Sequence, residues 1–141
     1  MSDRTLRRRL AGGQLSRLLP GVYLASPVAA STATGLHAAL LYAGTGAHLS
    51  HTTAAQVHGI DIACRPAIHL TVLASRTVKA QPGITMHRSA SLAGAQVHET
   101  GERLRVTSVS RTLFDLADVL ARPALDGAIA DAVRQRHVTV D

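Results

Sequence analysis

The alternation of apolar and polar residues divides the chain into helical and extended segments. Leu36, Leu40 and Ala43 follow the spacing i, i+4, i+7, which places their side chains on one face of a helix. Serine, a good N-capping residue, stands before several such segments, and glycine stands after several of them. The pattern predicts five helices, over residues 2–10, 32–43, 51–58, 109–120 and 123–137.

The third of these helices, residues 51–58, has a recognisable residue at each end. Ser50 precedes it, and we expect the Ser50 hydroxyl to accept a hydrogen bond from a backbone N–H of the first turn. Gly59 follows it, where a helix commonly ends in a left-handed conformation. The small side chains of Ala54 and Ala55 would let another element approach closely. Because so short a helix is not stable alone, we expect it to be packed inside a domain.

Each of the two C-terminal helices carries an apolar stripe that we expect to be buried. In the first of these two helices, Arg111 and Asp115 lie four residues apart on another face. The basic residue comes first, and this order stabilises a helix less than an acidic residue followed by a basic one. Two interpretations stay open: an ion pair on the surface, or an Arg111 held by some other group. Pro123 suits the first turn of the last helix. The two stripes consist of Val109, Leu113, Leu116 and Leu120, and of Leu125, Ala128, Ile129, Ala132 and Val133.

Extended segments lie between the central and the C-terminal helices. In residues 68–72 apolar side chains alternate with histidine and threonine, which is typical of a strand with one buried face. Residues 84–87 repeat this alternation after a basic loop at 74–83. Residues 96–100 and 104–107 then predict a hairpin. We expect antiparallel pairing throughout, because the connections are too short for helical crossovers.

The amino-terminal part combines a basic helix with a second hairpin. Arg4, Arg7 and Arg8 share one face of the first predicted helix. The Pro20-Gly21 turn then precedes a short strand-like run. A basic helix followed by a hairpin is typical of the second half of a winged helix-turn-helix.

The predicted fold class is therefore α+β. We expect a partial winged-helix segment over residues 1–26, made of the basic helix and its hairpin. An α/β domain over residues 31–141 would follow, in which helices pack on a small antiparallel sheet.

Composition adds a positive charge to this description. The chain has 141 residues, enough for one core, and a formal net charge of +6. Such a charge favours acidic partners such as nucleic acid. Lys79 is the only lysine, so a bias of the genome towards alanine and arginine is an alternative source of the charge. For the arginines near the amino end, the corresponding alternative is a solvated basic terminus.

The cysteine count and the apolar runs indicate a compartment. Cys64 is the only cysteine, which excludes an intrachain disulfide and fits a reducing cytosol. No signal peptide is recognisable, and the longest apolar run is far shorter than the ~20 residues that span a bilayer. We therefore expect a cytoplasmic protein that has no membrane partner.

Eight histidines raise the question of a metal site. His51 and His58 share one face of their predicted helix but lie about 10 Å apart along it. Two imidazoles on one zinc ion must each lie about 2 Å from it, so this pair cannot chelate. His48 and His51 could approach one ion, but no cysteine or carboxylate beside them completes a set. We therefore expect neither a metal site nor a cofactor.

No pattern typical of catalysis is present either. The only glutamates, Glu99 and Glu102, lie in a predicted turn and do not form the carboxylate cluster that holds Mg²⁺ in nucleases. No glycine-rich phosphate loop follows a strand. Cys64 next to Arg65 could be an activated thiol, but an inert cysteine is the commoner case. We expect no catalytic residues, and a protein that is not an enzyme.

With these segments placed, the chain resembles the AbiEi-type antitoxin family over nearly its whole length. The residues that carry the resemblance are Leu6-Arg7-Arg8-Arg9-Leu10, Gly21-Val22-Tyr23-Leu24, Leu49-Ser50-His51-Thr52-Thr53-Ala54-Ala55, His58-Gly59, Ile68-His69-Leu70-Thr71-Val72, Gly83-Ile84-Thr85-Met86-His87-Arg88, Val106-Thr107-Ser108 and Arg111-Thr112-Leu113-Phe114-Asp115-Leu116-Ala117. The resemblance implies a winged helix joined to an α/β domain, and repression of a toxin–antitoxin operon. Against the family's pattern we expect the chain to be truncated at the winged-helix end and to lack the nuclease domain into which some relatives continue.

The expected function is that of a DNA-binding, antitoxin-like transcriptional regulator. Its partners would be double-stranded operator DNA and, indirectly, a toxin. Two alternatives remain: a non-catalytic protein-interaction module, and a metal-dependent hydrolase that uses His48 and His51. The residues expected to contact DNA phosphates, none of them assigned to a base, are Arg4, Arg7, Arg8, Arg9 and Arg17.

Overall fold

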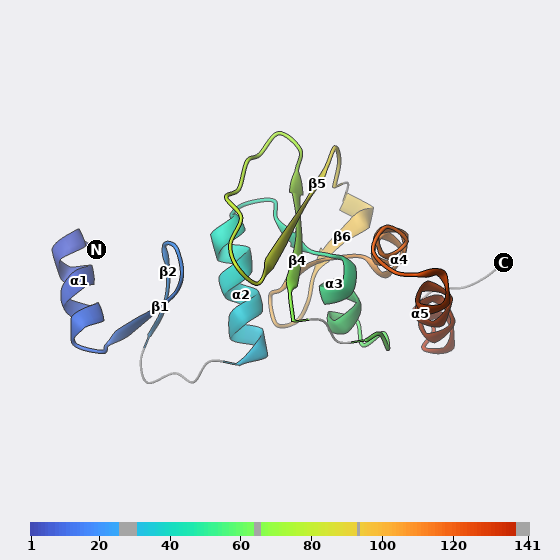
Figure 1. The fold of residues 1–141 in the computed structure, drawn as a ribbon, viewed down its shortest axis with the longest axis horizontal. Coiled ribbons are helices and arrows are strands. Elements are labelled where there is room, and N and C mark those ends of the chain that lie inside the picture. The colour runs from blue at the N-terminus through green and yellow to red at the C-terminus, as the bar shows by residue number, and fades with distance from the viewer. Residues whose placement is uncertain (26–30, 64–65, 93, 138–141) are drawn as a thin grey trace.

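A computed structural model describes residues 1–25, 31–63, 66–92 and 94–137 of the chain. Within these residues it contains five α-helices and two sheets, so the predicted mixed fold class is confirmed (Figure 1). The elements are α1 (Asp3–Ala11), β1 (Leu15–Leu19), β2 (Val22–Ala25), α2 (Thr32–Ala43), β3 (His48–Leu49), α3 (His51–Val57), β4 (Ile68–Leu73), β5 (Ile84–Ser89), the 3₁₀ helix η1 (Gly94–Gln96), β6 (Val97–Glu99), β7 (Arg105–Thr107), α4 (Val109–Leu116) and α5 (Arg122–Arg134).

The larger sheet has five strands in the order β5-β4-β3-β7-β6. It is mixed: β3 pairs with β4 and β6 with β7 in antiparallel fashion, whereas β4–β5 and β3–β7 are parallel. The prediction of an antiparallel sheet is therefore wrong. The connection at residues 74–83 contains no helix, but ten extended residues reach about 33 Å, more than the roughly 20 Å length of a six-residue strand. A loop is therefore long enough to return the chain for parallel pairing.

The register of β4 and β5 sorts their side chains onto two faces. Leu70 lies opposite Met86 and Thr71 opposite His87, and successive residues point to opposite faces. Leu70 belongs to the buried cluster that also contains Leu40 of α2. His69 and Thr71 point the other way, towards α3, and are buried as well. The sequence predicted one buried face for strand β4, but both faces of this strand are buried.

A second apolar cluster joins α3 to the two C-terminal helices. Ala55, Leu116 and Ala128 are buried in it, so the expected close approach at the alanines of α3 is confirmed. Helix α4 ends at Leu116 rather than at Leu120, although Leu120 still packs against this cluster from the following turn.

Not every residue of the predicted stripe in α5 is buried. Ala128 and Ala132 are fully buried, whereas Ile129 is 37% exposed and does not belong to the core. Helix α5 contacts the second apolar cluster through the small side chains of Ala128 and Ala132. These let α5 lie close to its neighbours, but the buried stripe of α5 is narrower than predicted.

The amino-terminal arm, which we define as α1 with the β1–β2 hairpin, lies at one end of the molecule beyond α2 (Figure 1). The predicted hairpin is confirmed: it is antiparallel, and Leu15 pairs with Ala25. Helix α1 has Ser2 as its N-cap and contains no buried residue. The boundary expected between residues 26 and 31 falls largely outside the described residues.

Candidate functional site

The arginines predicted to contact DNA all lie on the amino-terminal arm. Arg4, Arg8 and Arg9 are exposed on α1 and form no ion pair with any described residue. Arg7 is exposed too and pairs with Asp3 at 2.9 Å across one helical turn. Arg17 is exposed on β1, opposite Tyr23 of β2. The arm therefore presents guanidinium groups that the acids of the α/β body do not neutralise.

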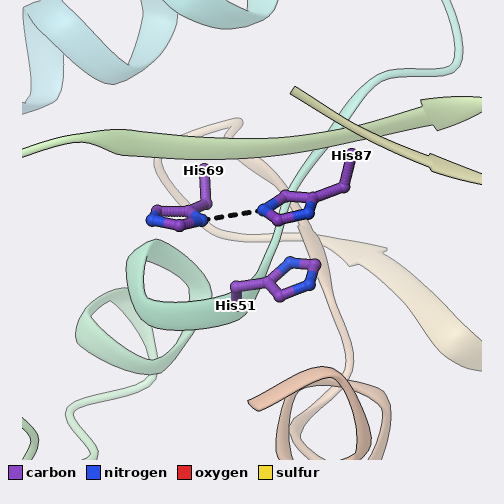
Figure 2. A group of neighbouring side chains, drawn as sticks. All are labelled: His51, His69 and His87. Carbon is purple, nitrogen blue, oxygen red and sulfur yellow. Dashed lines mark hydrogen bonds between the residues drawn. The ribbon is translucent and has the colours of Figure 1, made fainter. Parts of the chain in front are cut away.

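A second constellation, not predicted from the sequence, is a group of three histidines that we call the histidine cluster: His51, His69 and His87. Figure 2 shows the rings of His69 and His87 below β4 and β5, with the His51 ring from the start of α3 beneath His87. His69 Nδ1 and His87 Nε2 are 2.8 Å apart in a hydrogen bond. The rings of His51 and His87 stack with their centroids 3.6 Å apart. Each ring offers one nitrogen such that all three nitrogens lie within 4.8 Å of one another.

Local backbone and hydroxyl groups fix the position of the His51 ring. His51 has φ +52°, an uncommon value for a residue other than glycine, which turns the chain as α3 begins. Its Nδ1 lies 2.8 Å from Ser50 Oγ, and that oxygen accepts a hydrogen bond from Thr71 Oγ1. The prediction that the Ser50 hydroxyl caps the helix is therefore wrong: Ser50 occupies the N-cap position, but its side chain makes no capping bond.

A buried ion pair on α4 lies beside the cluster. Arg111 Nε and Asp115 Oδ1 are 2.9 Å apart, and their side chains are only 15% and 6% exposed. Arg111 also donates to Gln96 Oε1 and Ser89 Oγ. The pair is thus not a surface pair, and Arg111 is held by further groups besides Asp115. The other carboxylate oxygen, Asp115 Oδ2, is buried and has no hydrogen-bond partner.

Burial favours the neutral forms of these groups. Loss of solvent lowers the pKa of His51 to about 3, assisted by the neighbouring His87. Burial also lowers the pKa of His87, although Asp115 acts in the opposite direction. The pKa of Asp115 is raised by burial in spite of its bond to Arg111. Around neutral pH His51 and His87 are therefore neutral.

The sequence analysis considered His51 together with His48 or with His58, but neither of these two histidines belongs to the histidine cluster. His48 bonds the carbonyl oxygen of Gly46 and is not part of the cluster. His58 bonds the carbonyl oxygen of Thr107 and lies near His98 and His137. In the sequence, the only indication of the cluster is that each of two predicted neighbouring strands contains a histidine. The register of the two strands, which the sequence does not give, decides whether these histidines meet. Cys64 lies outside the described residues.

A groove elsewhere on the surface has no comparable chemistry. It has a volume of about 530 Å³ and is lined mainly by apolar atoms, among them Leu36, Val57 and Leu104. Glu102 is the one charged residue among those that line it. It contains neither the arginines of the arm nor a histidine of the cluster.

Comparison of the sequence with models of known protein families and with curated proteins found no significant match. Among the helices that the structure describes, none combines the length and the apolar character that crossing a membrane requires.

Proposed function

We propose that this chain binds double-stranded DNA through its amino-terminal arm, as an antitoxin-like regulator of a toxin–antitoxin operon. The observation that carries DNA binding is the group of exposed arginines on α1, next to an antiparallel hairpin. The regulatory part of the proposal is supported by the resemblance of the sequence to the AbiEi-type antitoxins.

The physical basis is neutralisation of the phosphate backbone. Arg4, Arg8 and Arg9 are free of ion pairs with the described residues, and guanidinium groups bind phosphate oxygens well. Each phosphate contact releases counterions, so the affinity falls as salt rises, by a slope of about −0.9 per contact on B-DNA. Those three arginines with Arg17 therefore predict a slope of about −3.6, and the release of Arg7 from Asp3 would extend it to about −4.5.

The test is the salt dependence of binding to a duplex that contains the promoter of the chain's own operon. A triple variant, R4Q/R8Q/R9Q, removes three charges from α1 while keeping good helix-forming residues. The matched control, K79Q/R103Q/R122Q, removes three charges from exposed positions on the body. We expect the α1 variant to reduce the salt slope by about 2.7 and the control to leave it nearly unchanged.

Two outcomes would overturn the proposal: wild type that binds the duplex with no salt dependence, and equal losses in the two triple variants. Regulation is tested separately by comparing the promoter duplex with a scrambled duplex of the same length. Equal affinity for both would leave DNA binding in place but exclude an operator function. If wild type binds no DNA and associates in light scattering, the interaction module is the better description.

A further inference from the structure

We propose that His51, His69 and His87 form a binding site for a divalent transition-metal ion, with zinc as the best-matched ion. This site is independent of the proposed DNA-binding function. It rests on three imidazoles that converge from three different elements, α3, β4 and β5 (Figure 2). Imidazole is a preferred ligand of zinc and of several neighbouring metals, and three histidines with an open fourth position are a known ligand set for zinc.

The spacing of the ring nitrogens is close to what a tetrahedral ion needs. With zinc–nitrogen bonds of 2.0–2.1 Å, ligand nitrogens lie about 3.3 Å apart. The 2.8 Å separation between His69 Nδ1 and His87 Nε2 lies just below this value, and the other separations do not exceed 4.8 Å. His69 and His87 already lie close to the spacing that one ion needs. The ring of His51 is stacked on that of His87, so it has to rotate before its lone pair points at the same ion.

The proton balance also permits binding. One proton lies between His69 and His87 in their hydrogen bond. When the ion binds, that hydrogen bond is replaced by two metal–nitrogen bonds, and the proton moves to the other nitrogen of the ring that carried it. A neutral imidazole binds a metal through a lone pair without releasing a proton, whereas a cysteine thiol must lose its proton first.

The surroundings provide the support that metal-binding histidines usually have. The Nδ1 of His51 bonds Ser50 Oγ, which leaves Nε2 as the remaining nitrogen of that ring. A hydroxyl or carboxylate on the second nitrogen commonly fixes the orientation of a ligand imidazole. Asp115 of the neighbouring helix α4 has a buried Oδ2 that makes no hydrogen bond. A bound ion would place a positive charge near this carboxylate oxygen. Arg111 donates its hydrogen bond to the other carboxylate oxygen, Oδ1.

The proposed ligands are shielded from solvent, so a bound ion would act on the stability of the fold. His51 and His69 are only 5% and 9% exposed, and the ion would link α3 to the parallel strands β4 and β5. A metal bound by the folded state alone stabilises that state by mass action. We therefore expect zinc to raise the melting temperature by roughly 5–10 °C at a hundredfold excess over its dissociation constant.

The experiment uses the full chain without a histidine tag, after removal of metals by a chelator. Zinc is titrated by calorimetry, and the melting temperature is followed by circular dichroism. The test variant is H87Q, because His87 lies on the edge strand β5 and is only half-buried. The matched control is H98Q, which removes an exposed histidine from the group around His58. We expect one zinc per wild-type chain, a loss of affinity of more than a hundredfold in H87Q, and no change in H98Q.

A second measurement needs no variant. In ¹⁵N spectra of the histidine rings of wild type, zinc should shift three of the eight histidines and leave five in place. Absence of saturable zinc binding in wild type, retention of full affinity in H87Q, or equal losses in H87Q and H98Q would overturn the proposal. Zinc-induced shifts in fewer than three rings would do so as well.

Discussion

The buried pair of Arg111 and Asp115 gives the sharpest test of how this fold is held together. Replacing Arg111 by methionine keeps much of the apolar stem but removes the guanidinium group. Asp115 then has no positive partner, although its side chain is only 6% exposed. Loss of one member of a buried pair costs about 3–5 kcal/mol of folding free energy, because the remaining charge stays desolvated.

The loss of folding free energy in R111M also has an upper limit. Asp115 can escape its unpaired charge by taking up a proton, and protonating a carboxyl of ordinary pKa at pH 7 costs about 4.2 kcal/mol. The hydrogen bonds from Arg111 to Gln96 and Ser89 are lost in addition, at about 1 kcal/mol each or less. We therefore expect R111M to lose about 3–6 kcal/mol at pH 7. For 141 residues this lowers the melting temperature by roughly 10–20 °C.

The assay is urea unfolding followed by circular dichroism, with a second variant as control. In R111M/D115N the buried group is a neutral amide, so the double variant should recover at least about 1.5 kcal/mol relative to R111M. The pH dependence has a definite sign. In R111M the folded state binds the proton of Asp115 more tightly than the unfolded state does, so its loss relative to wild type should shrink as the pH falls from 7 to 5. A loss below about 1 kcal/mol in R111M, or no recovery in the double variant, would refute this reasoning.

Three further predictions concern single residues. Gly44 has φ +84° and ψ −166°, a region open essentially to glycine alone, so G44A should lose about 1–3 kcal/mol in urea unfolding. The Ser50 hydroxyl bonds both Thr71 and His51 inside the protein, so S50A should lose about 2–4 kcal/mol by leaving buried groups unpaired. Burial lowers the pKa of His58, so its neutral form stabilises the fold above pH 6.5, and this stabilisation should be lost as the pH falls below 6.5 in thermal melts.

Each of these predictions has a matched control. G127A in the exposed interior of α5 should gain about 0.5–1 kcal/mol, so a loss like that of G44A would contradict the backbone explanation. Ser31 makes a side-chain cap at 3.2 Å, and S31A should lose about 1 kcal/mol; a loss as large as that of S50A would show that burial is not the cause. H58Q should reduce the dependence of stability on pH between 7 and 5 by the part that His58 contributes, since burial lowers the pKa of other histidines too. An unchanged slope would exclude His58 as one of its sources.

Much of the secondary structure followed from local residues. Ser31 and Gly44 marked the ends of α2 correctly, and Gly59, with φ +74°, ends α3 in the expected left-handed conformation. These signals act between residues close in sequence, through one hydroxyl or one backbone angle, so the sequence pattern contains them in full. The two-residue strand β3 was missed, because so short a segment shows no alternation.

The histidine cluster and the buried ion pair could not be found in this way. His51, His69 and His87 are separated by 18 residues at each step, and they meet only because β4 and β5 pair in parallel with Thr71 opposite His87. The sequence favoured the opposite direction of pairing, which would have changed the neighbours of His87. Ser50 is a second example. Its position before a helix predicted a capping bond, but its hydroxyl accepts a hydrogen bond from Thr71 of a distant strand.

The sequence by itself determined the helices with some of their ends, most of the strands, and the charge of the first seventeen residues, since these depend on neighbours along the chain. The tertiary structure decided the direction of strand pairing, the burial of both faces of β4, and the meeting of three imidazoles beside a carboxylate. These features depend on packing between distant segments, where many arrangements satisfy the same local preferences and only the assembled core selects one of them.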